Sequence, residues 1–241
     1  MWTSKLRLLR CLVPLVSALR GATEPGACRL PVLPISVRPT PPVARPVRNG
    51  RPEIQQLVVS WSPAYCAANG NLPEAKGECL DNRFGFVARA LVPLAPSQAN
   101  AHPLRCIESM PLGTTLTRRY YCIMPGVELM QDNWVNYGSC GFAHAGEYFD
   151  RIGQLWSALA YPDVEALAAG SGFLGATAFR RALLEANRLI GLKSESFWVD
   201  VRGRNVFSGF TVCYNRQFEF AACPSQPQSP AALRVIPING P

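Results

Sequence analysis

The sequence predicts a single disulfide-bonded domain that contains both β-strands and α-helices. Short β-branched apolar runs indicate the strands, and an apolar face that repeats at three- and four-residue steps indicates a helix. With 241 residues, 48% of them hydrophobic, the chain is long enough to bury one sizeable core but not two full domains. Its nine cysteines include no Cys-x-x-Cys pair, which favours disulfides over a zinc site.

The first half of this domain is predicted to begin with two strands. Residues 57–61 read Leu-Val-Val-Ser-Trp, a buried strand that Ser62-Pro63 closes. A second strand covers residues 84–92 and ends at Pro93. Residues 94–125 contain four prolines and show no clear period, so we expect this segment to be irregular and held by its cysteines.

The second half is predicted to contain three helices and then three strands. Residues 146–159 carry the clearest helical pattern, residues 163–169 form a short helix, and Thr177 caps a helix over 178–190 that ends at Gly191. The expected strands are 196–202, 206–214 and 217–222, with turns at 203–205 and 215–216. The order of these elements shows no internal repeat.

The two ends of the chain differ in composition from this domain. Residues 1–22 have a basic start, an apolar run and small residues before a cleavage position, which predicts a signal peptide. A mitochondrial transit peptide is the alternative, because the first 23 residues contain no acid. Residues 23–54 are a Pro/Arg-rich linker, residues 55–224 the domain, and residues 225–241 a loosely held tail. The apolar run of the leader is too short to span a membrane.

The positive charge is concentrated outside the domain. Residues 1–53 hold nine Lys/Arg and two Asp/Glu, whereas residues 54–241 hold fifteen and fourteen, a net charge of +1. A broad nucleic-acid-binding surface needs clustered cations on the folded body, so this distribution argues against one. After removal of Cys11 with the leader, eight cysteines remain, an even number that fits an oxidising compartment, either periplasmic or secreted.

Several landmarks resemble one known family. Residues 57–66, Leu-Val-Val-Ser-Trp-Ser-Pro-Ala-Tyr-Cys, resemble the first core strand and first disulfide cysteine of the ribonuclease T-two family. The later landmarks follow in order: Cys79, the strand to Pro93, the segment 134–140, a helix with Tyr148-Phe149, and Cys213 followed by Cys223. The resemblance covers about residues 55–224 and implies an α+β fold with a central antiparallel sheet and packed helices.

The resemblance also implies a set of disulfides. Cys66 should pair with Cys79, and Cys213 with Cys223. Cys140 should pair with either Cys106 or Cys122, which leaves Cys28 to take the remaining cysteine or to stay free.

Members of this family cleave RNA without a metal through a 2′,3′-cyclic phosphate, using two short motifs. The first resembles His-Gly-Leu-Trp-Pro, where this chain has Arg-Ala-Leu-Val-Pro at 89–93. The second resembles His-Glu-Trp-x-Lys-His-Gly-Thr-Cys, where residues 132–140 read Asp-Asn-Trp-Val-Asn-Tyr-Gly-Ser-Cys. The retained positions are Leu91, Pro93, Trp134, Gly138 and Cys140, and Ser139 is a mild change. The replaced positions are those of the proton carriers and the cation.

The replacements remove the chemistry that the reaction needs. One group must take a proton from the ribose 2′-hydroxyl, another must give one to the leaving oxygen, and a cation must stabilise the phosphorane. Arg89 has a pKa above about 12, and the reference pKa of Tyr137 is about 10. Asn133 does not titrate, and Asn136 has no charge. We therefore expect no catalytic residue in this chain.

Some residues could still line a remnant cleft, which we define as Arg89, Asp132, Trp134, Tyr137 and His144. Asp132 either helps to hold a ligand there or has a structural role, in which it satisfies backbone amides or pairs with Arg89, and we favour the structural role. The chain has two histidines, and His102 is expected in a surface loop. Trp61, Trp134 and Trp198 are expected in the core, and the basic-aromatic run 118–121 is expected to face solvent.

Three hypotheses follow from these observations. The first is an exported, catalytically inactive ribonuclease T-two-like protein that keeps the fold for RNA or ligand binding or for a structural role. The second is a weak or rewired endoribonuclease that uses His144 or an unconventional base. The third is a binding module for a non-RNA ligand in the remnant cleft. No cofactor or metal is implied, and the partner is RNA or another anionic ligand, bound weakly.

Overall fold

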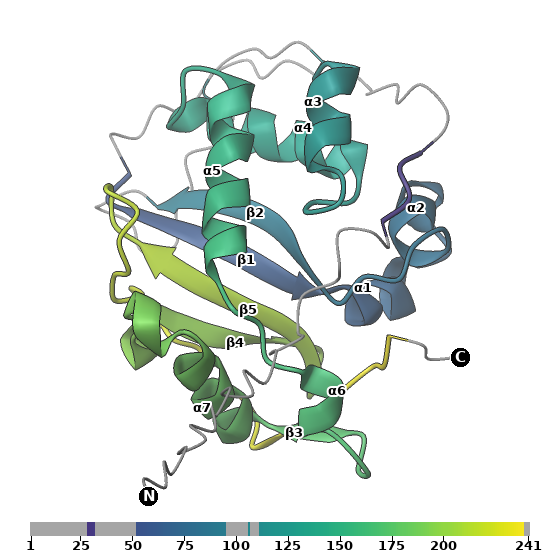
Figure 1. Ribbon diagram of the computed structural model, residues 1–241, viewed down its shortest axis with the longest axis vertical. Coiled ribbons are helices and arrows are strands. Elements are labelled where there is room, and N and C mark those ends of the chain that lie inside the picture. Colours follow the sequence, from purple (N-terminus) through teal and green to yellow (C-terminus); the bar gives the residue numbers. More distant parts are fainter. Residues whose placement is uncertain (1–27, 32–51, 95–105, 107–110, 239–241) are drawn as a thin grey trace, which may run out of the picture.

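A computed structural model describes residues 28–31, 52–94, 106 and 111–238. In this part of the chain the fold is α+β, with one six-stranded sheet and helices packed beside it (Figure 1). The strands are β1 Ile54–Trp61, β2 Phe86–Leu94, β3 Phe173–Gly175, β4 Phe197–Arg202, β5 Val206–Tyr214 and β6 Ala232–Arg234. The α-helices are α1 Ser62–Asn69, α2 Lys76–Cys79, α3 Thr114–Tyr120, α4 Val127–Asn136, α5 Ala145–Ala158, α6 Val164–Leu167 and α7 Ala176–Ala186.

The sheet is antiparallel in its central part. β1 pairs with both β2 and β5, and β4 pairs with the other side of β5. β6 reaches β5 through one parallel pair, Val206 with Arg234, and β3 lies antiparallel to β6. This order leaves β2 at one edge of the sheet.

One face of the sheet carries the hydrophobic core. Alternate residues of β1, namely Leu57, Val59 and Trp61, are buried there. α5 crosses β1 and β2 (Figure 1), while α7 places the ring of Phe179 at 4.9 Å from Phe207 and 5.7 Å from Phe210 of β5. The helices thus bury the face that the alternating strand pattern predicts.

All eight cysteines of the described part form disulfides. The predicted pairs Cys66–Cys79 and Cys213–Cys223 are confirmed. Of the two alternatives for Cys140, the structure has Cys106. The remaining bond joins Cys28 to Cys122 across 94 residues of sequence.

That last disulfide attaches part of the Pro/Arg-rich segment to the body. The side-chain amide of Asn82 accepts from the backbone N–H of Arg29 at 2.6 Å and donates to its carbonyl at 3.1 Å. Arg118 also donates to the carbonyl of Pro31 at 3.0 Å. Residues 28–31 are therefore part of the folded unit, although the sequence places them in a linker.

Several predicted elements are confirmed within a residue or two. The helix expected at 146–159 is α5, and the strands expected at 196–202 and 206–214 are β4 and β5. The short helix expected at 163–169 is α6, where the Oδ1 atom of Asp163 accepts from the N–H of Ala166 at 2.9 Å. That bond satisfies one of the donors that every helix start leaves free.

Two predictions in the first half are wrong. Pro93 does not end its strand but lies inside β2, opposite Gln55. Because β2 is an edge strand, a missing N–H can be tolerated there. The segment 94–125 is not wholly irregular, since Thr114–Tyr120 forms α3. This helix is short, and the burial of Thr117 and Tyr120 stabilises it more than its own periodicity does.

Two predictions in the second half are also wrong. Thr177 does not cap its helix, because α7 starts at Ala176 with Gly175 as the N-cap and ends at Ala186, followed by a separate 3-10 turn before Gly191. Residues 217–222 do not form a strand, and their one β-bridge joins Phe220 to Tyr214 of β5. The Oδ1 atom of Asn215 accepts from the N–H groups at 217 and 219 and holds the chain in a loop instead.

The tail that the sequence predicts to be loosely held contains part of the sheet. Residues 232–234 are β6, in which Leu233 is fully buried. Further along, the indole N–H of Trp61 donates to the carbonyl of Ile236 at 2.7 Å, and the N–H of Ile238 donates to Glu165 at 2.8 Å. The tail lacked a long apolar run, so its single buried leucine gave little sequence signal.

Among the described residues, no helix has the length and hydrophobicity that crossing a membrane requires.

A half-buried carboxyl group in β4 is expected to make stability depend on pH. The two oxygens of Asp200 accept hydrogen bonds from the Trp198 indole N–H at 2.6 Å and the Thr211 hydroxyl at 2.7 Å. Burial raises the pKa of Asp200 from 3.8 to about 6, although both hydrogen bonds act in the opposite direction. Trp198, expected in the core, is only half-buried on this other face of the sheet.

We expect Asp200 to destabilise the fold at neutral pH and to stop doing so in mild acid. Its folded pKa lies above its unfolded value, so the folded state takes up the proton first as pH falls from about 7 to about 4. The free energy of unfolding should gain up to about 3 kcal/mol from this group across that window. Urea unfolding at several pH values should show Asp200→Asn more stable than wild type at pH 7 and equal to it near pH 4. An unchanged pH slope in the variant would contradict this assignment.

Candidate functional site: a buried ion pair at the β2 bulge

The first motif lies at a β-bulge in β2. Val58 of β1 is opposite Ala90, and Val59 is opposite Ala88, so Arg89 is the extra residue between them. A bulge of this kind bends the strand and changes the direction of the side chain, which is one reason bulges occur beside active sites. The bulge therefore sets the direction of the side chain at position 89, where the resemblance places a catalytic histidine.

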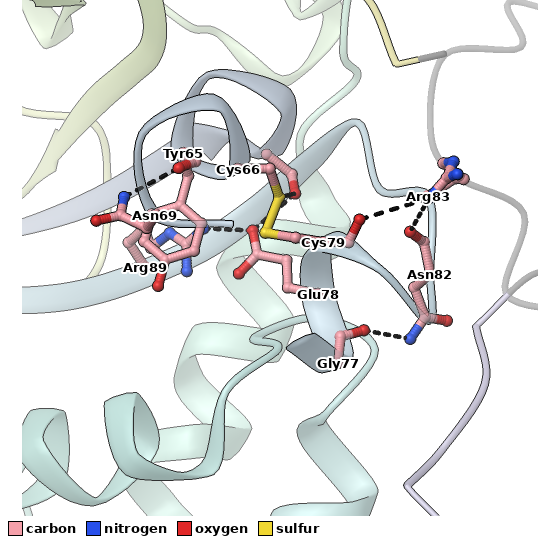
Figure 2. The surroundings of a disulfide bond; sticks show 10 residues. Tyr65, Cys66, Asn69, Gly77, Glu78, Cys79, Asn82, Arg83 and Arg89 are labelled. Carbon is pink, nitrogen blue, oxygen red and sulfur yellow. Dashed lines mark hydrogen bonds and ion pairs between the residues drawn. A yellow bond between two sulfur atoms is a disulfide. The ribbon is translucent and has the colours of Figure 1, made fainter. Parts of the chain in front are cut away.

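The side chain of Arg89 is directed toward α1 and α2 (Figure 2). Its guanidinium forms an ion pair with Glu78 and lies over the ring of Tyr65, 4.0 Å from the ring centroid. Only 13% of the Arg89 side chain and 3% of Glu78 are exposed. The same Glu78 oxygen also accepts from the hydroxyl of Ser62 at 2.7 Å. The cation is thus neutralised and shielded from solvent.

The sequence-based pairing of Arg89 with Asp132 is wrong, because the partner is Glu78 and Asp132 is exposed. Sequence reasoning did not consider Glu78. A signal was present, however: Glu78 precedes Cys79, whose predicted bond to Cys66 brings residue 78 beside α1. Burial also raises the pKa of Tyr65, with Arg89 lowering it by a smaller amount.

The second motif continues α4 into a 3-10 turn at Gly138–Cys140. Asn133, at the position of the family's glutamate, is 3% exposed and donates to the backbone carbonyls of Arg89 at 2.9 Å and Leu129 at 2.8 Å. Its amide therefore links α4 to the bulge. The hydroxyl of Ser139 donates to the carbonyl of Val135 at 3.0 Å, which explains why the change from threonine to serine is tolerated.

The retained residues of this motif pack against α5. A Cβ atom at Gly138 would lie 2.6 Å from the Trp134 ring and 2.7 Å from the Tyr148 ring. The hydroxyl of the fully buried Tyr148 accepts from the N–H of Leu91 at 3.2 Å and donates to its carbonyl at 3.1 Å. Trp134 and Gly138 are thus required by packing, which agrees with a structural role.

The other residues of the predicted cleft do not converge on the ion pair. Tyr137 and Asn136 are half-buried where α4 ends, and Asp132 is exposed. His144 is exposed at the N-cap of α5, where its backbone carbonyl accepts from Tyr148 at 3.4 Å. The structure therefore brings Asn133 to the backbone of Arg89, while Trp134 packs against Tyr148 and both His144 and Asp132 are exposed.

A pocket of about 370 Å³ adjoins the ion pair. Its wall includes the buried side chains of Ser62 and Glu78, the Cys66–Cys79 disulfide and Phe84, and the tail closes one side with Ile236–Ile238. Its volume lies in the range of small-molecule sites. Sequence reasoning missed this pocket because its lining comes from segments far apart in the chain.

The described residues include no group of three or more His, Cys, Asp or Glu side chains that could hold a metal ion. At the bulge, the available groups are a guanidinium, an amide and a carboxylate already paired with the guanidinium. These groups can bind and orient a ligand, but the first two do not exchange protons near neutral pH.

Comparison with known proteins agrees with this architecture. No protein-family model matches the sequence. A probable ribonuclease of Haemophilus influenzae is 36% identical over 120 residues, which are 44% of this chain and 43% of that protein. The chain thus matches less than half the length of this curated relative.

Solved structures match over most of the chain. A ribonuclease-related protein from Calystegia sepium superposes with a TM-score of 0.61 at 14% identity, covering 78% of this chain and 98% of that one. Ribonuclease NT, in complex with 5′-AMP, gives a TM-score of 0.55 at 13% identity over 77% of this chain and 98% of that one.

The described part therefore has a disulfide-bonded α+β fold that it shares with solved structures of ribonucleases and a ribonuclease-related protein. The fold is that of the ribonuclease T-two family, as the sequence motifs predict.

We expect Gly138→Ala to destabilise the fold because the added methyl would collide with two buried rings. Overpacking of this kind typically costs about 1–3 kcal/mol. Urea unfolding with the disulfides intact would measure the change. Gly141→Ala is the matched control, since its nearest contact would be the Gln55 amide at 3.9 Å. Equal effects of the two variants would show that packing does not explain why glycine is at 138.

We also expect Arg89→Met to destabilise the fold strongly, by about 3–5 kcal/mol, because Glu78 would remain buried without a counter-ion. The double variant Glu78→Gln/Arg89→Met should recover most of this loss, because it also removes the negative charge at position 78. Little is lost with the ion pair itself, since the buried Arg89 Nε atom has no hydrogen-bond partner. A double-mutant cycle from urea unfolding gives the coupling. Simple additivity of the two single changes would refute the coupling.

Proposed function

We propose that this chain is an exported ribonuclease T-two-like protein that does not cleave RNA and keeps the fold to bind RNA or another ligand, or for a structural role. The observation that supports this most is that Arg89 and Asn133, at two catalytic positions of the family, are buried and already engaged. Arg89 is paired with Glu78, and Asn133 is bonded to the backbone of Arg89.

These contacts of Arg89 and Asn133 matter because a general acid or base must be able to exchange protons and to reach the substrate. A guanidinium is not a proton carrier near neutral pH, and an amide does not titrate. A ligand that reached the bulge would also have to compete with Glu78 and Tyr65 for the guanidinium. Each lost acid-base function typically costs about two to four orders of magnitude in rate.

The second candidate is a weak ribonuclease that forms a 2′,3′-cyclic phosphate. The observation in its favour is that His144 is exposed and lies close in sequence to Tyr137. His144 is outside both motifs, however, and a base outside them would have to meet the same short distances to the 2′-hydroxyl.

The third candidate is a ligand-binding module. The pocket beside the ion pair supports it, because it combines apolar walls with the Ser62 hydroxyl and the Glu78 carboxylate. Ribonuclease NT, which shares the fold, holds 5′-AMP. 5′-AMP is therefore a sensible first ligand to test, and the nearly neutral body makes tight nonspecific RNA binding unfavourable.

Export is supported by the cysteines. The eight described cysteines form four disulfides, a density typical of proteins that fold in an oxidising compartment, here periplasmic or secreted. The leader on which the signal-peptide prediction depends lies outside the described residues.

The test is a cleavage assay with purified, disulfide-intact protein on homopolymer RNA from pH 4 to pH 8. We expect no cyclic-phosphate product above the protein-free rate, because the bulge supplies no proton carrier. The matched variants are Tyr137→Phe, Arg89→Ala and His144→Ala. Turnover that disappears in Tyr137→Phe or Arg89→Ala would overturn the proposal, and turnover that disappears only in His144→Ala would establish the weak-ribonuclease alternative.

A further inference from the structure

The turn that follows α7 exposes two aliphatic side chains beside several cations. Residues Arg188–Ile190 form a 3-10 turn that ends at Gly191. Leu189 is 89% exposed, the highest value for a large apolar side chain in the described part, and Ile190 is 46% exposed. α7 lies at the opposite end of the molecule from α3 and α4 (Figure 1), so this turn is remote from the β2 bulge.

The fold fixes this exposure. Asn187, at the start of the turn, is 1% exposed, and its side chain exchanges hydrogen bonds with the N–H and carbonyl of Ala160 at 2.8 and 2.7 Å and donates to Leu183 at 2.9 Å. Gly191 then takes a left-handed conformation with φ of 79°, and Leu192 is buried again. Because buried residues hold both ends, Leu189 and Ile190 cannot fold back onto the core.

The surroundings of the turn are basic. Residues 176–193 contain four cations and one acid, Glu185. Arg180 donates to the carbonyls of Ser194 and Phe197, and Glu185 forms an exposed pair with Arg188 at 3.5 Å. Arg181 and Lys193 have no acidic partner among the described residues. A hollow of about 550 Å³ beside the turn is lined by Arg180, Arg181, Leu184 and Arg188, together with Thr177, Glu185 and Leu192.

We propose that this basic-aliphatic turn, residues 188–193 with Arg181, binds the surface of an anionic lipid bilayer. Aliphatic side chains can enter the boundary between headgroups and acyl chains without a shaped pocket, and flanking Arg and Lys attract anionic headgroups. The turn offers both chemistries side by side. Two aliphatic side chains are a smaller anchor than one fatty acyl chain, so attachment is reversible and needs the charge as well.

The chemistry of the turn favours lipid over other partners. Single-stranded RNA is held by aromatic stacking, and the one aromatic residue in 176–193, Phe179, is fully buried. Protein interfaces concentrate their binding energy in Trp, Tyr and Arg, whereas leucine is under-represented there. The exposed Leu-Ile pair lies near Arg181 and Lys193 but lacks the aromatic anchor that either partner would use.

Vesicle cosedimentation of the full disulfide-intact chain tests the proposal, with phosphatidylcholine vesicles compared to vesicles containing 30% phosphatidylglycerol. We expect binding to the anionic vesicles only, weakened at least fivefold when salt is raised from 50 to 300 mM. Leu189→Ser/Ile190→Ser and Arg188→Gln/Lys193→Gln should each reduce it about tenfold. The changes lie in an exposed turn, and circular dichroism would confirm that both variants fold.

The matched control is Leu80→Ser, which removes another leucine, 63% exposed, in a different region and should bind as wild type does. Absence of binding to anionic vesicles, equal binding to neutral vesicles, or loss in the control alone would overturn the proposal. So would a result in which the turn variants abolish self-association or retention on immobilised homopolymer RNA but leave vesicle binding unchanged.

Discussion

The backbone of β2 around its bulge depends on side chains from helices that come later in the chain. An edge strand leaves backbone groups without a ladder partner, and burying them costs free energy unless something else satisfies them. Asn133 of α4 supplies a donor for the carbonyl of Arg89, and Tyr148 of α5 satisfies both the N–H and the carbonyl of Leu91. Sheet and helices are therefore joined at both motifs, at a replaced position through Asn133 and Arg89 and at the scaffold position Leu91 through Tyr148. Trp134 and Gly138 pack against Tyr148, which agrees with a structural role for both.

These contacts limit which residues can occupy positions 89 and 133. Asn133 donates to the Arg89 carbonyl, and an amide does so without titrating. The side chain at 89 is largely shielded from solvent, so a permanent cation there requires a counter-ion, which Glu78 provides from α2. The arginine at 89 and the buried carboxylate of Glu78 thus belong together, because Arg89 without Glu78 would leave a charge without a counter-ion away from solvent.

The sequence predicts most of the scaffold and less of the site. The apolar, β-branched run 57–61, the helical face of 146–159 and the cysteine order give β1, α5 and two disulfides, because each is a local pattern or a family landmark. The partner of Arg89 was not predicted, since Glu78 has no periodicity and reaches the bulge only through tertiary packing. β6 and the pocket lining were missed for the same reason: Leu233 and Ile236–Ile238 acquire their neighbours by long-range pairing with β3, β5 and Trp61.

The distribution of charge indicates that any anion-binding site of the body lies away from the β2 bulge. With a net charge of +1 over residues 54–241, the body exerts little long-range attraction on a polyanion, so recognition has to come from a local cluster. Arg89 cannot be its centre, because Glu78 neutralises it and both are shielded. The cations at the end of α7 face a single acid, and they lie beside exposed aliphatic side chains at the other end of the molecule. Substitutions at the bulge should therefore leave this surface intact, since no hydrogen bond or ion pair among the described residues links Leu189 or Ile190 to β2.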